Sequence, residues 1–224
     1  MSSPNLLLIF VKAPRKGQVK TRLAAYIGED LALRMYQAMV EDLLENVRES
    51  HHYDIQIMVW PEKSEEEVRN WLQWPGVIAS QIQGDLGIKL NHAFGKGFNQ
   101  GFKRIIIIGS DLPGISSSLI TQCFQKLQQY PLVLGPAWDG GYYLIGLNST
   151  QPQLLTKVSW STPEVLAETI DRAQQANLPY YLLKEMRDID EYEDVLALWK
   201  SIKNVKRNNL PHSTAAILEI LNSK

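Results

Sequence analysis

The sequence of 224 residues has little cysteine, little histidine and no excess of charge of one sign. Its single cysteine, Cys123, excludes an intrachain disulfide bond and a thiolate zinc site. The four histidines have no spacing typical of a histidine metal site. The formal net charge of -1 lacks the basic excess of a nucleic-acid-binding surface. We therefore expect no nucleic-acid partner, and any metal must be bound mainly by oxygen atoms.

Long hydrophobic runs are also absent. The longest, residues 6–11 and 105–108, fall far short of the roughly 20 residues that a membrane helix needs. The first residues carry no pattern of a cleavable signal peptide. We expect no membrane span and a cytoplasmic location. At about 150 residues per domain, the length predicts one domain over residues 1–224, with a core over about residues 5–200 and a C-terminal helical tail over about residues 207–224.

Apolar segments alternate with amphipathic ones through the first half of the chain. Strands are predicted at residues 5–11, 53–60, 77–83 and 104–109, and helices at 29–48, 64–71, 86–98 and 117–128. Several of these strands are apolar on both faces, which is typical of parallel strands covered by helices. The pattern predicts an α/β fold with a mainly parallel sheet flanked by helices.

The second half is less regular. Strands are predicted at residues 132–135, 142–147 and 180–183, and helices up to 175, from 190 to about 206 and after Pro211. Helix starts are indicated by two capping boxes, Ser64 with Glu67 and Asp190 with Glu193, and by Ser161 or Thr162.

Five cations cluster in the first predicted loop, before the first carboxylate of the chain: Lys12, Arg15, Lys16, Lys20 and Arg22. The loop also contains Gly17, and it joins the end of a strand to a helix. Ligands of open α/β sheets collect at the carboxyl ends of the strands, and backbone N–H groups with long cationic side chains suit a polyphosphate. The loop lacks the first glycine of a Walker A motif. We favour anion binding over a solvated loop with scattered charges.

Two further segments offer carboxylates. Asp111 follows the most apolar strand, where it can bind a hard cation such as Mg²⁺ or form an Asx-turn before Pro113. Asp188 and Asp190 face the same side of an extended segment, and either can complete a metal site. The alternative for Asp190 is a helix cap, which the pattern alone favours.

Two glycine-containing segments are candidate binding loops. Asp139, Gly140, Gly141 and Tyr142, with Trp160, can offer a carboxylate, accessible backbone and aromatic faces to a polyhydroxylated substrate, or the segment can be a tight hairpin. Residues 84–87, with Asp85 and Gly87, can admit a nucleoside, or Asp85 can cap a helix.

Several motifs occur together and in order: FVKAPRKGQVKTRL at residues 10–23, GDLG at 84–87, IGSDLP at 108–113, LGPAWDGGYYLIGL at 134–147 and WST at 160–162. In these the chain resembles a bacterial family of small GT-A-type glycosyltransferases, some assigned to arsenosugar biosynthesis. That family is similar in fold to molybdenum-cofactor and phospholactate guanylyltransferases. The resemblance covers about residues 10–194.

The resemblance implies a nucleotide-diphospho-sugar transferase fold, a GT-A three-layer sandwich with a mainly parallel mixed sheet. It places the nucleotide phosphates at Gly17, Lys20 and Arg22, the nucleoside at residues 84–87, the transferred group at residues 139–142 and the metal at Asp111. A late aspartate segment of related nucleotidyltransferases matches Asp190. Two positions depart from the pattern. Ser110 stands where glycosyltransferases often carry the first Asp of D-x-D, which favours the nucleotidyltransferase branch, and Lys89 stands where Arg is expected.

The expected function is a glycosyltransferase that uses Mg²⁺ or Mn²⁺, a nucleotide-sugar donor and a small acceptor. The alternatives are a nucleotidyltransferase that releases pyrophosphate and a non-catalytic nucleotide-binding module. The oligomeric state stays open. The expected site residues are catalytic Asp111 and Asp139; nucleotide-binding Lys12, Arg15, Gly17, Lys20, Thr21, Arg22, Asp85 and Gly87; substrate-binding Gly140, Gly141, Tyr142 and Trp160; and metal-binding Asp111, Asp190 and Asp188.

Overall fold

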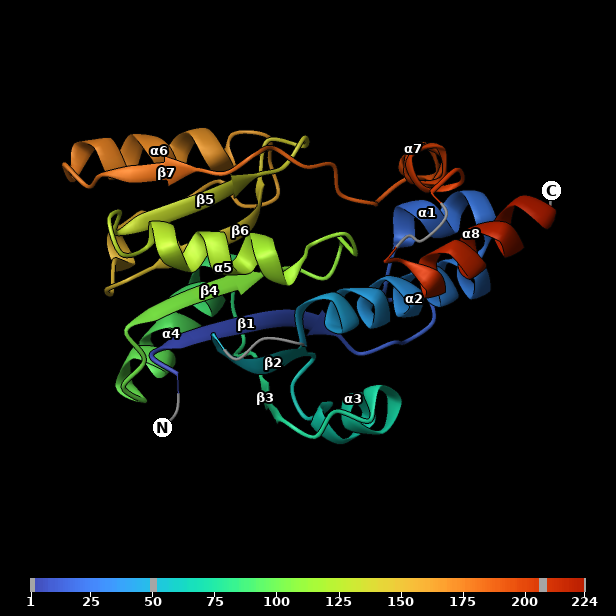
Figure 1. The fold of residues 1–224 in the computed structure, drawn as a ribbon, viewed down its shortest axis with the longest axis horizontal. Coiled ribbons are helices and arrows are strands. Elements are labelled where there is room, and N and C mark those ends of the chain that lie inside the picture. Colours follow the sequence, from blue (N-terminus) through green and yellow to red (C-terminus); the bar gives the residue numbers. More distant parts are fainter. Residues whose placement is uncertain (1–2, 49–51, 206–208, 224) are drawn as a thin grey trace.

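One seven-stranded sheet organises the computed structural model, which describes residues 3–48, 52–205 and 209–223 (Figure 1). Its strands are β1 (Asn5–Lys12), β2 (Asp54–Trp60), β3 (Val77–Ser80), β4 (Arg104–Ile108), β5 (Leu132–Pro136), β6 (Tyr142–Leu147) and β7 (Tyr180–Leu182), in the order β3-β2-β1-β4-β6-β5-β7. Only β6 runs antiparallel to its neighbours β4 and β5 in this sheet. The predicted α/β class with a mainly parallel mixed sheet is confirmed.

Helices cover both faces of the sheet (Figure 1). The helices α2 (Glu29–Arg48), α3 (Glu65–Leu72) and α5 (Ser117–Lys126) pack on one face, and α4 (Leu86–Asn99) and α6 (Val165–Gln175) on the other. Strand β1 shows why both faces are apolar. Leu7 and Ile9 belong to the first core, whereas the alternate residues Leu6 and Leu8 belong to the second. The fold is therefore the expected three-layer sandwich.

A third apolar cluster joins α2 to α1 (Thr21–Ile27), α7 (Tyr192–Ile202) and α8 (Pro211–Asn222). The fully buried Asp42 of α2 accepts hydrogen bonds from the backbone N–H groups of His212 and Ser213, at 3.0 and 2.7 Å. A carboxylate at this place satisfies free N–H groups of the helix terminus. The side chains of Asp42, Glu45 and His212 come within metal-ligand reach of one another. Because two backbone donors use Asp42, we interpret the cluster as a helix cap.

Local details differ from the sequence prediction. Helix α1 was not predicted, β3 ends at Ser80 instead of 83, and α6 begins at Val165, with no side-chain cap. Ser64 precedes α3, but its hydroxyl accepts a hydrogen bond from Arg15 and does not cap the helix. Helix α7 ends at Ile202, before the predicted end near Lys206, which lies outside the described residues. Among the residues that the structure describes, no helix combines the length and the hydrophobicity of a membrane span.

Candidate active site

A two-part cleft lies at the carboxyl ends of β1, β2 and β4. Its first part has a volume of about 520 Å³, and the adjoining part about 550 Å³. Both are within the size range of small-molecule sites. The residues that line both parts include Asp111, Asp139, Tyr142, Tyr143 and Asp190. These shared residues make the two parts a single cleft.

The first loop places Lys20 at the centre of the cleft. Lys20 has a left-handed backbone conformation (φ 47°), which is uncommon outside glycine, and its carbonyl receives the first hydrogen bond of α1. Its side chain is only 3% exposed. The ammonium contacts the carboxylate of Asp111, lies 3.7 Å from that of Asp190 and donates to the carbonyl of Ile189. Two carboxylates thus face one positive centre.

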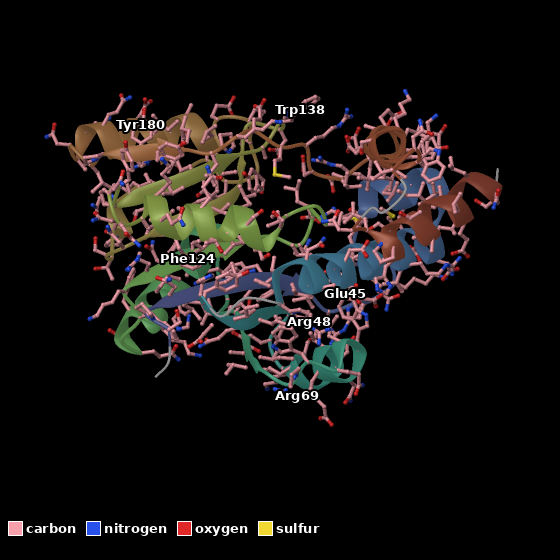
Figure 2. All side chains as sticks on the ribbon, viewed as in Figure 1. Glu45, Arg48, Arg69, Phe124, Trp138 and Tyr180 are labelled. Carbon is pink, nitrogen blue, oxygen red and sulfur yellow. The ribbon has the colours of Figure 1, made fainter. Side chains whose placement is uncertain are left out.

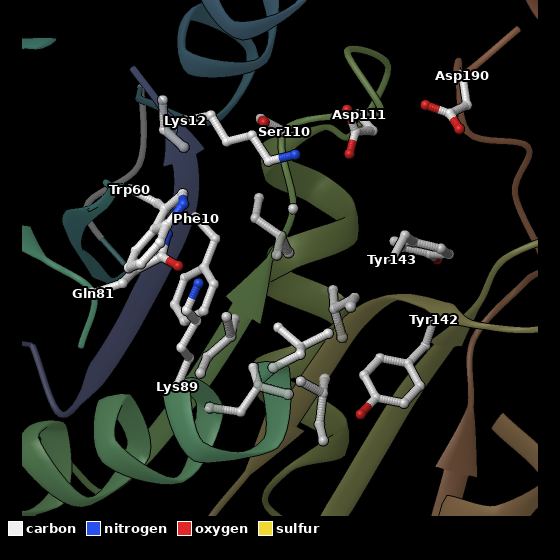
Figure 3. A pocket seen from close by; sticks show the side chains of 18 of the residues that line it. Phe10, Lys12, Trp60, Gln81, Lys89, Ser110, Asp111, Tyr142, Tyr143 and Asp190 are labelled. Carbon is white, nitrogen blue, oxygen red and sulfur yellow. The ribbon is translucent and has the colours of Figure 1, made fainter. Parts of the chain in front are cut away.

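Asp190 reaches the cleft because residues 186–190 are fixed to the sheet edge by backbone hydrogen bonds. Met186 N–H donates to the carbonyl of Pro136 at 3.0 Å, and Ile189 N–H to that of Asp111 at 3.1 Å. The predicted capping box falls one residue later, at Glu191 and Asp194. The prediction that Asp190 caps α7 is therefore wrong, and its carboxylate points into the cleft (Figure 3).

Arg22 completes a group of four charges with Lys20, Asp111 and Asp190. Its guanidinium donates to Asp190 at 3.0 Å, and its side chain is 70% exposed. The two cations and two carboxylates balance one another. Mg²⁺ and Mn²⁺ prefer oxygen ligands, commonly one or two carboxylates with phosphate and water. The carboxylates of Asp111 and Asp190 fit this requirement because they already face one cation.

The opposite end of the first part contains Lys12, Lys89, Trp60 and Gln81 (Figure 3). Lys12 and Trp60 are register partners at the ends of β1 and β2. Lys89, from α4, holds its ammonium 3.6 Å from the centre of the Trp60 ring. Burial and, to a smaller extent, the charge of Lys12 lower the pKa of Lys89.

The hydroxyl of Tyr36 fixes the end of β1 behind this group. It accepts a hydrogen bond from the N–H of Lys12 at 2.7 Å and donates to the carbonyl of the same residue at 2.9 Å. Burial raises the pKa of Tyr36. A neutral hydroxyl is therefore kept, and it can serve as donor and acceptor at once.

The adjoining part of the cleft is formed by the β5–β6 hairpin and residues 160–163. Asp139 accepts a hydrogen bond from Gly141 N–H at 2.9 Å, as expected for a tight turn. Tyr142 meets Trp160 edge to face, with ring centres 6.4 Å apart. Burial, and then the charges of Asp139 and Asp111, raise the pKa of the nearby Asp188.

The predicted residues divide into two groups. Those that line the cleft are Lys12, Lys20, Arg22, Asp111, Asp139, Gly141, Tyr142, Trp160, Asp188 and Asp190. Those that do not are Arg15, Gly17, Thr21, Asp85, Gly87 and Gly140.

Other contacts account for several residues of the second group. Arg15 forms an ion pair with Glu67 at 2.7 Å. Asp85 caps α4, because it accepts a hydrogen bond from Ile88 N–H at 2.9 Å. A Cβ atom at Gly87 would lie 2.7 Å from Nε1 of Trp160, and one at Gly140 would overlap the backbone of Pro163. These two glycines permit close packing of the loops around the cleft.

Several cleft residues were not among the predicted ones, notably Trp60, Gln81 and Lys89. Trp60 had a usable signal, since it is the last residue of a predicted strand. Lys89 lies three residues after Leu86, which places both on one face of α4 and toward the cleft. The buried Gln81 follows β3 and donates from Nε2 to the carbonyl of Met58 at 2.8 Å. No local sequence pattern predicts that Gln81 lines the cleft.

Residues 43–162, slightly more than half of the chain, match the family described as "Uncharacterized protein conserved in bacteria (DUF2064)". The chain belongs to this family. A crystal structure from Desulfovibrio desulfuricans G20, named a "putative nucleotide-diphospho-sugar transferase", is 32% identical, with 99% of this chain and 98% of that chain covered and a TM-score of 0.92. The resemblance stated from the motifs is thereby confirmed.

More distant structures share the fold alone. A CMP:2-keto-3-deoxy-manno-octonic acid synthetase complexed with CTP is 12% identical, with 88% of this chain and 98% of that chain covered and a TM-score of 0.52. Rv0371C of Mycobacterium tuberculosis H37Rv, in complex with manganese, is 13% identical, with 88% and 99% covered and a TM-score of 0.53. Among curated proteins, no sequence matches this chain.

Proposed function

We propose that this protein is a metal-dependent glycosyltransferase, which moves a sugar from a nucleotide-sugar donor to a small acceptor. The observation that carries the proposal is the convergence of Asp111 and Asp190 on one cation, between a cationic end and an aromatic end of one cleft. The name of the 32% identical relative supports the same reaction class.

The proposed metal ligands are Asp111 and Asp190, with Asp188 as the alternative to Asp190. When bound, Mg²⁺ or Mn²⁺ would stabilise the negative charge on the leaving diphosphate. Lys20 and Arg22 hold the two carboxylates close together in the free protein. Once a cation takes these carboxylates, the two side chains can add positive charge at the diphosphate.

The hairpin side of the cleft would bind the sugar and the acceptor. Trp160 and Tyr142 supply aromatic faces, and Gly141 gives access to the backbone. Asp139 would either orient the sugar or act as the base that takes the proton of the acceptor hydroxyl. In the second role, it would take this proton while the new glycosidic bond forms and the bond from the sugar to the diphosphate breaks. The exposed Trp138, with the Arg187 guanidinium 5.3 Å from its ring, lies at the tip of this hairpin (Figure 2).

A nucleotidyltransferase is the second candidate, and Ser110 favours it. Residues 109–111 are Gly, Ser and Asp, and Ser110 is buried, so the end of β4 supplies one carboxylate where a D-x-D motif would supply two. The same cleft would then join a nucleoside triphosphate to a phosphorylated small molecule and release pyrophosphate.

One assay separates the candidates. The protein is incubated with Mn²⁺ and labelled nucleoside triphosphates, or with UDP- and GDP-sugars, over a panel of acceptors. Release of a nucleoside diphosphate from a sugar donor supports the glycosyltransferase, and release of pyrophosphate supports the nucleotidyltransferase. Metal-dependent nucleotide binding without turnover would instead indicate a non-catalytic module. Asp111→Asn should lower any turnover by about 100-fold while the protein stays folded.

A further inference from the structure

The cations that line the cleft differ in whether a carboxylate already neutralises them. Lys20 contacts Asp111, and Arg22 pairs with Asp190. Lys12 and Lys89 have no carboxylate within ion-pair distance among the described residues. The uncompensated positive charge of the cleft therefore lies at its Trp60 end.

These two ammonium groups are held on the same side of the cleft. Lys12 continues β1 at its carboxyl end, where Tyr36 fixes its backbone through two hydrogen bonds. Lys89 projects from the first turns of α4 and rests over the Trp60 ring, next to Phe10 (Figure 3). Two like charges repel one another, and the partly buried Lys89 also loses hydration. An anion between them would relieve both costs.

We infer that Lys12 and Lys89 form an anion-binding point for phosphate oxygens of the nucleotide, separate from the group of Lys20, Arg22, Asp111 and Asp190. This inference rests on the proposed function, and it assigns a binding role to Lys89. The cation–π contact with Trp60 keeps the Lys89 side chain in place before the ligand arrives. Lys20 and Arg22 serve first to hold the carboxylates.

The test compares phosphate-bearing ligands with their nucleosides. Binding of UDP, GDP, CDP and ADP, of the four nucleosides and of inorganic pyrophosphate is measured by calorimetry with Mn²⁺ present. The variants are Lys12→Gln, Lys89→Gln, Lys89→Arg and the control Lys96→Gln. Lys96 is an exposed residue near the end of α4, away from the cleft, so its variant removes the same charge from the same helix.

For the nucleoside diphosphate that binds best, Lys12→Gln and Lys89→Gln should each weaken binding by about tenfold, the range of one charge-assisted hydrogen bond in a partly exposed site. Nucleoside binding should change less than about twofold. Lys89→Arg should retain most of the affinity because it keeps the charge, and Lys96→Gln should match the wild type. Melting curves verify that each variant is folded.

Two results would overturn the inference: diphosphate binding unchanged in both glutamine variants, or a loss as large for the nucleoside as for the diphosphate. The second result would indicate that Lys89 contacts the nucleobase and not the phosphates. Pyrophosphate separates this inference from the proposed function. If pyrophosphate binds and needs both lysines, while no nucleotide binds, the anion site stands and the proposed function fails. If neither ligand binds, both are rejected.

Discussion

Replacement of Lys20 by Met tests the central arrangement of the cleft. Met nearly preserves the volume of the buried side chain but removes its charge. Asp111 and Asp190 then face each other without the cation between them, and the carbonyl of Ile189 loses its donor. We expect a loss of stability in the free protein and a stronger response to divalent metal.

The size of the loss follows from the geometry. At the 3.7 Å between Lys20 and Asp190, the Coulomb energy is roughly 1 kcal/mol in water and roughly 4 kcal/mol at an effective dielectric constant of 20. Because the carboxylate side chains are 51% and 36% exposed, solvent screening favours a value near 2 kcal/mol, as an order of magnitude. The lost hydrogen bond to Ile189 adds about 1 kcal/mol. A total of about 3 kcal/mol lowers the melting temperature by roughly 6–12 °C in a chain of this size.

The assay is thermal unfolding of both proteins with EDTA and with increasing Mn²⁺. Mn²⁺ should raise the melting temperature of Lys20→Met more than that of the wild type, since the ion no longer competes with the ammonium for the carboxylates. Lys16→Met is the matched control. Lys16 lies in the same loop and pairs with Asp30 at the exposed surface, so its variant should melt within about 2 °C of the wild type. A Lys20→Met protein that is equally unaffected, or that gains nothing extra from Mn²⁺, would refute the reasoning.

Three further changes test individual residues. Arg15→Ala should leave nucleotide affinity within about twofold of the wild type, because the Arg15 side chain pairs with Glu67 and does not line the cleft. A tenfold loss of affinity in calorimetry would show instead that Arg15 contacts the nucleotide. Gly87→Ala should cost about 1–3 kcal/mol in urea unfolding, since the new methyl group meets Trp160 and the backbone of Leu155; unchanged stability would contradict this packing. Asp188→Asn should raise the melting temperature at pH 7. The pKa of Asp188 is raised in the folded protein, so the negative charge of its carboxylate opposes folding at pH 7. The gain in melting temperature should therefore vanish as the pH falls toward the ordinary pKa of 3.8. A gain that persists at that pH would point to another cause.

The helix caps show which features of the fold local sequence patterns can predict. Ser116 caps α5, and Asp85 caps α4, which is one of the two roles that its segment allows, because each accepts a hydrogen bond from an N–H three residues ahead. Ser64 and Asp190 have equally good local patterns, yet distant cations, Arg15 and Arg22, engage their side chains. A single sequence does not reveal such partners.

The candidate site shows the same division. The ends of β1 and β4 are evident from residue patterns next to predicted strands, whereas Asp190 enters the site through the family resemblance, because its local pattern favours a helix cap. Their convergence depends on the strand order, which places β4 directly beside β1. The cation–π pair of Lys89 and Trp60 joins a helix and a strand, and neither local pattern specifies it.

The reversed direction of β6 has a consequence for how this protein family can diversify. Because β6 runs against β4, the hairpin turn before Tyr142 arrives at the same edge as the end of β4, opposite the first loop. Under the proposed function, the turn would determine the choice of acceptor and the first loop the choice of donor, so the two choices would depend on separate stretches of chain. A graft of residues 137–141 from another family member should change the preferred acceptor and leave nucleotide affinity as it was, so the turn can evolve as an exchangeable module.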